Sequence, residues 1–239
     1  MSMRGTENAI SLRVSLFSGC VLACLPLACA DRETSPPRPM NQATAAVPPP
    51  WQPVELIAVG EGPPVPADAS LRPAHERAIV ASNTLFGQLS AALLAAIGTP
   101  ASVAAGEAPG PAGAIAVCQE AAPQIAATVS EEAGLRIGRT GVRLRNGQNT
   151  APAWAIDAIA ARSGEPRAWR SPSGDGDARL GVLLPIRMMP LCMQCHGPRD
   201  LIDPAVIAAL EERYPGDQAT GFEANELRGW FWIEAPLAR

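Results

Sequence analysis

Two cysteines and a histidine near the C-terminal end of the chain have the types and the spacing to do chemistry. Cys192 and Cys195 are separated by two residues, and His196 follows at once. This order is the attachment signature of a c-type haem, in which both thiols become thioethers and the imidazole binds the iron. The sequence holds only two histidines, so the position of one directly behind the cysteine pair predicts a covalently attached haem.

A zinc site, a redox-active dithiol and a plain disulfide are the other interpretations of this motif. A zinc site needs four ligands, and beyond the motif the obvious donors are only Cys118 and His75. A thioredoxin-like pair follows a strand and opens a long helix, whereas Pro190 precedes this motif and Gly197-Pro198 follows it. A haem uses all three side chains of the motif, and we therefore favour it over the other three.

The first 30 residues are predicted to be an export signal. Arg4 and Arg13 supply positive charge, and residues 14–30 form an apolar stretch that ends in Ala28-Cys29-Ala30. A charged start, an apolar run and a small-x-small end are typical of a secretory signal peptide. We therefore expect the mature protein in the periplasm.

The cysteines within this signal raise the alternative of a lipoprotein signal. There the cleavage precedes a cysteine that carries lipid, and Val21-Leu22-Ala23-Cys24 fits that pattern better than Pro26-Leu27-Ala28-Cys29. A lipid anchor to a membrane and free release therefore both stay open. Beyond residue 30 the cysteines are Cys118, Cys192 and Cys195. An odd number of thiols in an oxidising compartment leaves one that needs an explanation.

The composition excludes some partners and suggests the domain organisation. The chain has 239 residues, a formal net charge of −4 and no lysine. Because it has no basic run, we do not expect it to bind nucleic acid. Residues 31–70 contain ten prolines, and we expect an extended linker over residues 31–71. Residues 72–239 are then expected to form one domain.

Hydrophobic periodicity predicts helices first, followed by strands with helices between them. Ser82, Leu85 and Leu89 share one stripe of an amphipathic helix over residues 74–97, since they recur at spacings of three and four. A second helix is expected over residues 115–129, interrupted at Pro123. The further expected elements are strands over 135–146, 167–170, 179–189 and 227–234, helices over 152–162 and 204–214, a loop over 99–113 and a turn over 174–177. This order predicts one α+β domain.

Seven stretches of the chain together resemble one family of proteins. They are Ala114–Cys118 with Ala122-Pro123, Gly138-Arg139-Thr140, Arg145-Asn146 with Asn149 and Trp154, Pro190–Gly197, Tyr214-Pro215, Ala219–Phe222, and Arg228-Gly229. Their order and spacing across residues 72–235 are similar to those of exported, PAS-like c-type haem domains, long catalogued as a domain of unknown function. One such stretch would be weak, but seven in order are specific.

This resemblance implies a fold and a set of iron ligands. The fold would be PAS-like, a small antiparallel sheet flanked by helices and preceded by a long N-terminal helix, with one haem c on it. The cysteine before the Ala-Pro pair, Cys118, would be the second axial ligand opposite His196. Without the resemblance, Cys118 is better explained as a small buried hydrophobe, which free cysteines often are.

Other occupants of the sixth iron position stay open in the sequence. His75 lies near the start of the first helix beside Glu76 and Arg77, and we expect it at the surface. Met188 and Met189 adjoin the haem motif, and we expect them to pack in the core. An open sixth position is the last alternative, and it would admit a gas or a peroxide.

Arginines are the expected partners of the haem propionates, because guanidinium groups pair with carboxylates in a bidentate way. Arg139, Arg143 and Arg145 would lie on one face of the expected strand over residues 135–146. We expect Arg139, and after it Arg145, to bind the propionates. A solvated strand face is the alternative.

Aromatic side chains are expected either to wall the porphyrin or to belong to the general core. They are Trp154, Phe222, Trp230 and Trp232.

The expected ligands favour a redox protein. Thiolate and imidazole together would fill both axial positions and stabilise ferric iron, which suits electron transfer or redox sensing through a redox or signalling partner. A gas or redox sensor in which Cys118 is displaced is the alternative. A peroxidase-like enzyme needs an open iron face and an acid–base group, and no spare histidine in the expected core supplies one.

Overall fold

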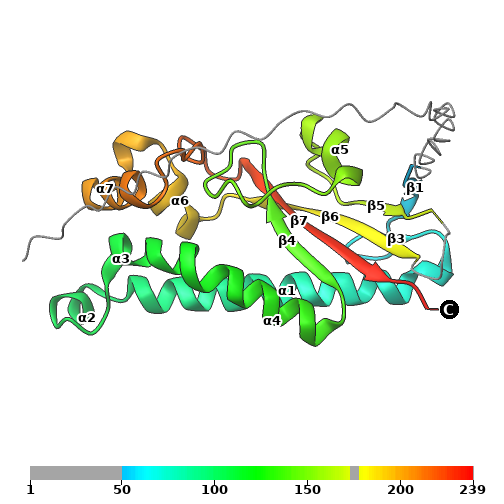
Figure 1. Ribbon diagram of the computed structural model, residues 1–239, viewed down its shortest axis with the longest axis horizontal. Coiled ribbons are helices and arrows are strands. Elements are labelled where there is room, and N and C mark those ends of the chain that lie inside the picture. Colours follow the sequence, from blue (N-terminus) through cyan, green and yellow to red (C-terminus); the bar gives the residue numbers. More distant parts are fainter. Residues whose placement is uncertain (1–49, 173–177, 239) are drawn as a thin grey trace, which may run out of the picture. The chain divides into compact units, whose positions relative to one another are not determined.

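The computed structural model describes residues 50–172 and 178–238 of the chain. The predicted export signal, the lipoprotein alternative, residues 31–49 of the predicted linker and the whole of the predicted turn over 174–177 lie outside the described residues. Within the described part, a five-stranded antiparallel sheet is joined by helices that cover its two faces (Figure 1). The expected α+β fold with a long N-terminal helix and a small antiparallel sheet is confirmed.

The sheet runs in the order β1-β5-β6-β7-β4, and every neighbouring pair is antiparallel. Its strands are β1 (Gln52–Val54), β4 (Arg136–Thr140), β5 (Arg167–Arg170), β6 (Arg179–Arg187) and β7 (Leu227–Pro236). A separate two-residue ladder joins β2 (Leu56–Ile57) to β3 (Val65–Pro66). The two longest strands, β6 and β7, are antiparallel neighbours inside the sheet. The end of β6 at Arg187 therefore lies beside the start of β7 at Leu227.

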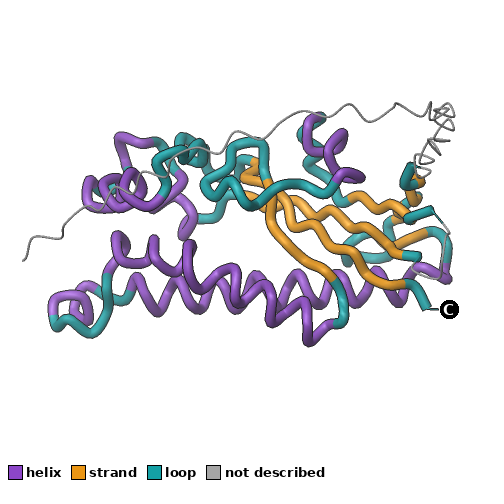
Figure 2. Tube along the Cα trace, in the orientation of Figure 1, coloured by secondary structure: helices purple, strands orange, loops and turns teal. Residues whose placement is uncertain are grey.

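All the helices lie between β3 and β7 in the sequence, and β4, β5 and β6 are interspersed among them (Figure 2). They are α1 (Arg72–Ile97), α2 (Pro100–Ala104), α3 (Gly110–Ala116), the π-helical turn Val117–Ala121, α4 (Ala122–Ala133), α5 (Ile156–Ala160), α6 (Pro190–His196) and α7 (Pro204–Arg213). Short 3₁₀ turns cover Ala69–Leu71, Ala153–Ala155 and Arg199–Leu201.

The main core lies between the sheet and the pair α1 and α4, which run side by side along it (Figure 1). Ala78 and Leu85 of α1 are fully buried against Val182 of β6 and Ile233 of β7. By length and composition alone, residues Ala69–Ile97 could cross a membrane. One face of this helix is nevertheless part of the core, as in the central helix of many globular domains.

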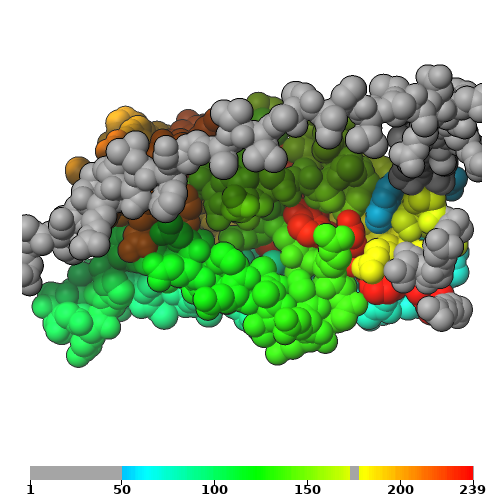
Figure 3. Space-filling model, in the orientation of Figure 1, coloured from blue at the N-terminus to red at the C-terminus, as the bar shows by residue number. Residues whose placement is uncertain are grey.

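The opposite face of the sheet is covered by α5 and by tryptophans. Trp230 is almost fully buried there, and its indole nitrogen donates to the Ser163 carbonyl at 2.7 Å. Trp154 stacks on Trp51 with ring centroids 5.3 Å apart, and its nitrogen donates to the buried Glu234 at 2.9 Å. In the space-filling view, α4 and the segment after β4 leave only part of β7 visible (Figure 3).

A smaller unit packs α7 against α3 at the end of the sheet. Ile115 of α3 is buried among Val206, Leu210 and Tyr214. Helix α6 precedes α7 in the sequence and lies beside this unit, so the predicted haem motif is held opposite α1.

Pro123 interrupts the second long helix through a π-helical turn. Proline has no N–H and cannot donate to the carbonyl four residues earlier. In the structure the N–H of Ala122 instead reaches back to the carbonyl of Val117, which is the wider hydrogen bond of a π turn. The turn spans Val117–Ala121 and therefore contains Cys118. The helix then continues to Gly134, whose left-handed φ of 61° ends it.

The sequence expectations for two elements need correction. The loop expected over 99–113 contains α2, whose first turn is capped by Thr99 and Ser102 in a reciprocal capping box. The strand expected over 135–146 ends at Thr140. Because β4 is an edge strand, it can pair only with β7, and their ladder stops where Thr140 faces Trp230. Arg143 and Arg145 therefore do not belong to a strand face.

The predicted linker is also shorter than expected where the structure describes it. Residues Gln52–Val54 pair with β5, and the 3₁₀ turn Ala69–Leu71 leads into α1 with Leu71 buried. Pro53 is compatible with β1 because β1 is an edge strand, and one side of its backbone has no ladder partner.

Candidate functional site

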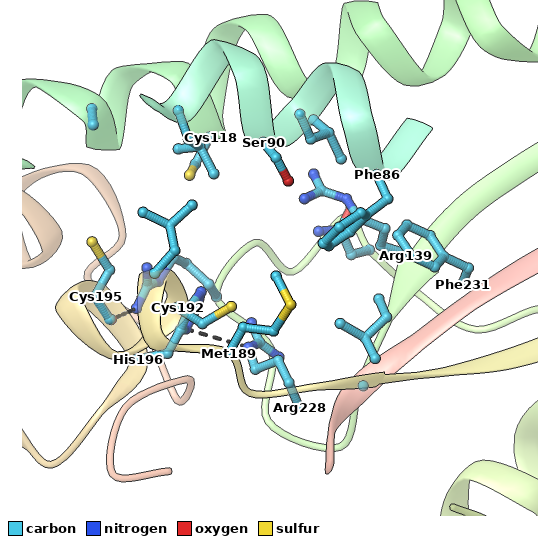
Figure 4. Close-up of a pocket in the computed structure, with 18 of the residues that line it drawn as sticks. Phe86, Ser90, Cys118, Arg139, Met189, Cys192, Cys195, His196, Arg228 and Phe231 are labelled. Carbon is cyan, nitrogen blue, oxygen red and sulfur yellow. Dashed lines mark hydrogen bonds between the residues drawn. The ribbon is translucent and has the colours of Figure 1, made fainter. Parts of the chain in front are cut away.

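One cavity brings together all six residues that the sequence singled out as cofactor-binding. They are Cys118, Arg139, Arg145, Cys192, Cys195 and His196. The cavity has about 1120 Å³ of empty space, which includes open solvent at its mouth. The helix that carries Cys118 forms one wall, and α6 with the cysteine motif forms the opposite one (Figure 4).

The predicted haem motif forms the short helix α6, which follows β6. Its first turn starts at Pro190, where a missing N–H costs nothing. Its last turn is held by the segment after α7, because the N–H of Phe222 donates to the His196 carbonyl at 3.0 Å and that of Gly221 to the Gly197 carbonyl at 2.7 Å. Cys192, Cys195 and His196 consequently all line the cavity.

The imidazole of His196 is oriented by a backbone carbonyl. Its Nδ1 lies 2.6 Å from the oxygen of Ala219, so Nδ1 carries the proton and donates it. Arg228 Nε lies 3.3 Å from the same nitrogen, a longer contact that needs the opposite protonation, and the shorter one decides the tautomer. Nε2 is then left unprotonated, which is the form in which metal-binding histidines are held by a second group.

Burial and neighbouring cations keep this histidine neutral. Burial is the main cause that lowers the pKa of His196 well below its usual value, and Arg228 and Arg145 lower it further. A neutral imidazole is the form that can bind a metal ion.

The three thiols in the described part of the chain are free. Burial raises the pKa of Cys118, while the nearby Arg145, Arg139 and Arg228 act to lower it. Burial also raises the pKa of Cys195, to about 11. Both side chains are therefore protonated thiols at neutral pH. Cys118 faces the cavity from the π-helical turn (Figure 4).

Arg145 connects the segments around α6. It forms an ion pair with Asp217 at 3.0 Å, and both side chains are buried. Its Nη2 also donates to the carbonyls of Cys195 and Ala219. Its Nη1 is buried and has no hydrogen-bond partner within the described residues. Arg145 therefore holds together the segments that form this wall of the cavity, and its Nη1 remains available to donate a hydrogen bond.

Arg228 lines the cavity beside the histidine, although the sequence did not single it out as a ligand-binding residue. It belongs to one of the seven family-like stretches, so a signal was present. What the sequence could not show is that the first residues of β7 cross behind α6. Gly229 next to it leaves room for the backbone of Thr140 on β4, where any side chain would overlap.

Apolar side chains make most of the remaining wall, as in most cofactor pockets. They include Phe86, Leu89 and Leu93 of α1, Ile115 of α3, Ile186 of β6 and Phe231 of β7. The aromatic side chains that line the cavity are not the ones expected from the sequence. Trp154, Trp230 and Trp232 pack on the opposite face of the sheet, because residues in a strand alternate between faces and Phe231 takes the inner one.

Phe222 is the expected aromatic residue that comes nearest to the site without lining the cavity. It meets the His196 ring edge-on, with centroids 6.4 Å apart, and the guanidinium of Arg143 lies 3.4 Å from its centroid. It therefore supports the histidine from behind.

The other residues expected as possible iron ligands, His75, Met188 and Met189, lie in different surroundings. His75 is only 3% exposed and does not line the cavity, so its expected surface position is wrong. Adjacent helix residues point about 100° apart, and the polar neighbours of His75 were no guide to its own face. Met188 is buried beside Phe222, as expected. Met189, expected in the core, lines the cavity, and its side chain points into it (Figure 4).

The donor set suits a porphyrin better than a bare metal ion. No group of three or more His, Cys, Asp or Glu side chains that could hold an ion is found within residues 50–172 and 178–238. A haem brings four nitrogens of its own and needs only axial ligands from the protein. Two thiols and an unprotonated Nε2 on one wall, a third thiol opposite, and a buried arginine donor without a partner therefore fit a haem.

The fold and the cavity define a class, an α+β domain whose sheet and long helix enclose a pocket with a Cys-x-x-Cys-His helix on one wall. The model of the Tll0287-like family matches residues 41–236, and the chain belongs to this family, as the resemblance of its seven stretches indicated. A similar solved structure is described as the cyanobacterial heme-protein Tll0287. It is 18% identical, with a TM-score of 0.46, over 72% of this chain and 98% of that one. No curated protein matches the chain.

Proposed function

We propose that this protein is an exported, monohaem c-type protein that acts in electron transfer or in redox sensing through a partner protein. Cys192 and Cys195 would form the two thioether bonds, and His196 would bind the iron through Nε2. Cys118 would be the second axial ligand. When bound, the haem would supply a one-electron redox centre of low potential. The printed description of the solved relative as a heme-protein supports the cofactor.

The observation that carries the proposal is the composition of the single cavity around α6. All three thiols of the described chain and the carbonyl-oriented imidazole face it from two opposite walls. A disulfide between the two motif cysteines would leave the histidine and Cys118 without a role. A haem accounts for the whole set.

Sensing by displacement of Cys118 is the second candidate, and the π-helical turn favours it. Such turns are frequent at functional sites, and converting one to a regular helix would rotate the thiol away from the cavity. An enzyme of the peroxidase type has less support. Apart from His196, no histidine lines this cavity in the described part of the chain, and such chemistry needs an acid–base group near the iron.

The location and the partner rest on the sequence. The predicted signal in residues 1–30 supports export to the periplasm, where haem is attached to such motifs, and Cys24 supports a lipid anchor as the alternative. Redox sensing would require a signalling partner, and electron transfer a redox partner.

The experiment is mass spectrometry and absorption spectroscopy of protein matured with a cytochrome c assembly pathway. We expect one haem that survives denaturation and a low-spin ferric spectrum. Cys118→Ala should give a high-spin ferric spectrum, whereas the control Met189→Leu should not, although its sulfur also faces the cavity. An unchanged spectrum in Cys118→Ala would show that the sixth ligand is another group.

Carbon monoxide added to the reduced protein separates the functions. No binding supports a closed electron carrier, and slow binding with loss of the thiolate supports a sensor. Rapid binding with peroxide turnover would instead support an enzyme. A mature protein without any added haem mass would refute the cofactor.

A further inference from the structure

Four arginines gather around His196 and the cavity, and they differ in what they bind. Arg143 forms an ion pair with Glu226 at 2.8 Å, and Arg145 one with Asp217 at 3.0 Å. Arg139 and Arg228 form no ion pair with a carboxylate among the described residues. Both of these line the cavity, whereas Arg143 does not.

Arg139 comes from the middle of β4 and has no side-chain hydrogen bond within the described part of the chain. Its backbone is fixed by pairing with Phe231 of β7, whose ring also lines the cavity. Its guanidinium lies in the cavity near Phe86 (Figure 4). A guanidinium removed from water without a partner is costly, and such groups in folded proteins are normally paired.

Arg228 comes from the start of β7 and is only partly satisfied. Its Nη1 donates to the carbonyl of Arg143 at 3.2 Å, and its Nε lies against His196. Burial lowers the pKa of Arg228 most, to about 10, and the cations Arg145, Arg139 and Arg143 lower it further, while Asp217 is the one nearby anion that raises it. Two unpaired cations therefore face one cavity and repel each other unless an anion joins them.

We propose that Arg139 and Arg228 together form the receptor for the two carboxylates of one dianionic ligand, which on the proposed function are the haem propionates. Two guanidinium groups that form no ion pair in the described structure match two carboxylates in number and in charge. Each can form a charge-assisted, two-point hydrogen bond that neither has in the protein alone.

This proposal changes one role expected from the sequence. Arg145 was expected as the second propionate partner, but its ion pair with Asp217 and its bonds to Cys195 and Ala219 already use most of its donors. Arg145 then positions α6, and Arg228 takes the ligand. The inference rests on haem binding, so its test must separate the two claims.

The test compares haemin with haemin dimethyl ester, which has the same porphyrin without the carboxylate charges. Both are titrated into the full chain with Cys192→Ser and Cys195→Ser, where the haem cannot attach covalently. We expect haemin to bind about tenfold or more tightly than its ester, since hydrogen bonds to charged groups are the strong ones. In Arg139→Gln and in Arg228→Gln, this ratio should fall toward one.

Arg143→Gln is the matched control, because it removes the same charge from the same cluster but not from the cavity wall. It should keep the ratio. Equal binding of haemin and ester, or an Arg143→Gln effect as large as the others, would overturn the receptor while leaving haem binding intact. Failure of both porphyrins to bind, together with absence of haem in the matured wild type, would instead refute the proposed function.

A second measurement applies to the covalent protein and is decisive if the serine variants do not fold. Resonance Raman spectra of the matured protein report hydrogen bonds of the propionates through their bending bands. These bands should shift in Arg139→Gln and Arg228→Gln at unchanged haem content, and not in Arg143→Gln. Unchanged bands in both variants would overturn the proposal.

Discussion

At the scale of single residues, Gly138 illustrates how tightly the sheet is packed behind the cavity. It faces Trp232 directly across the β4–β7 ladder, and a Cβ at this position would overlap the indole ring. The glycine therefore lets the ring lie over β4 while its neighbour Arg139 points into the cavity.

Gly138→Ala is expected to lower the free energy of unfolding by about 1–3 kcal/mol, because overpacking forces side chains or backbone to shift. Urea unfolding followed by tryptophan fluorescence measures it. Gly147→Ala is the control, since a Cβ there meets nothing within 4 Å. Equal stability of Gly138→Ala and wild type would show that Trp232 moves away at little cost.

His75 makes a second prediction at this scale, because burial lowers its pKa and its Nε2 has no hydrogen-bond partner in the described structure. Below the ordinary pKa of about 6.5, the unfolded chain binds a proton that the folded chain does not. Stability from this group is therefore full above that pH and is lost as the pH falls toward the folded pKa.

The measurement is urea unfolding of holoprotein at pH 7.5 and pH 5. Wild type should lose more stability between these conditions than His75→Leu, which cannot be protonated and leaves no unpaired nitrogen. The same loss in both proteins would assign the pH dependence to other groups. His196 does not distort the comparison, since both proteins retain it.

At the scale of elements, the sequence predicted what local periodicity controls and missed what partners control. The pattern of Ser82, Leu85 and Leu89 gave α1 correctly, and Pro123 marked the interruption of the second helix. The end of β4 at Thr140 depends on where β7 begins to pair, and no local pattern contains that information.

The residues of the site divide in the same way, into those that a local pattern predicts and those that depend on the folded surroundings. The spacing of Cys192, Cys195 and His196 is local and was recognised at once. That Cys118 lies opposite them came only from the family resemblance, since about 70 residues of chain separate the two helices. Arg228 was missed because its significance is that it lines the cavity without forming an ion pair, which is a property of the folded surroundings.

The π-helical turn around Cys118 yields the prediction at this scale. Pro123 removes one donor from the helix, and we expect Pro123→Ala to let a regular α-helix form through residues 117–121. Each residue of an α-helix turns by about 100°, so the thiol would rotate away from the cavity. The ferric spectrum of the holoprotein should then shift toward high spin, as in Cys118→Ala.

Pro204→Ala is the matched control for this change, because that proline also begins a helix, α7, but no π turn precedes it. Its spectrum should stay low-spin. A low-spin spectrum in Pro123→Ala as well would show that the turn is held by the surrounding side chains and not by the proline.

At the scale of the whole molecule, the described domain consists of a large core and a smaller unit that meet at the cavity. The large core joins α1 and α4 to the sheet, whereas α6 and the segment after α7 belong to separate small clusters around Phe222 and Ile115. Few apolar side chains therefore link α6 to α1 except across the cavity. A bound ligand that touches both walls would hold the two units together.

We accordingly expect the protein made without haem attachment to loosen locally rather than globally. Small clusters with few apolar contacts open at low free energy, and ligand binding to the closed form suppresses this opening. Hydrogen exchange followed by mass spectrometry should show faster exchange in α6 and in residues 215–222 of the haem-free form. Peptides from β6 and β7, and from α5 on the far face of the sheet, serve as internal controls and should change little. Faster exchange spread evenly over all of these peptides would mean that the domain has one cooperative core, and that the cavity does not divide it.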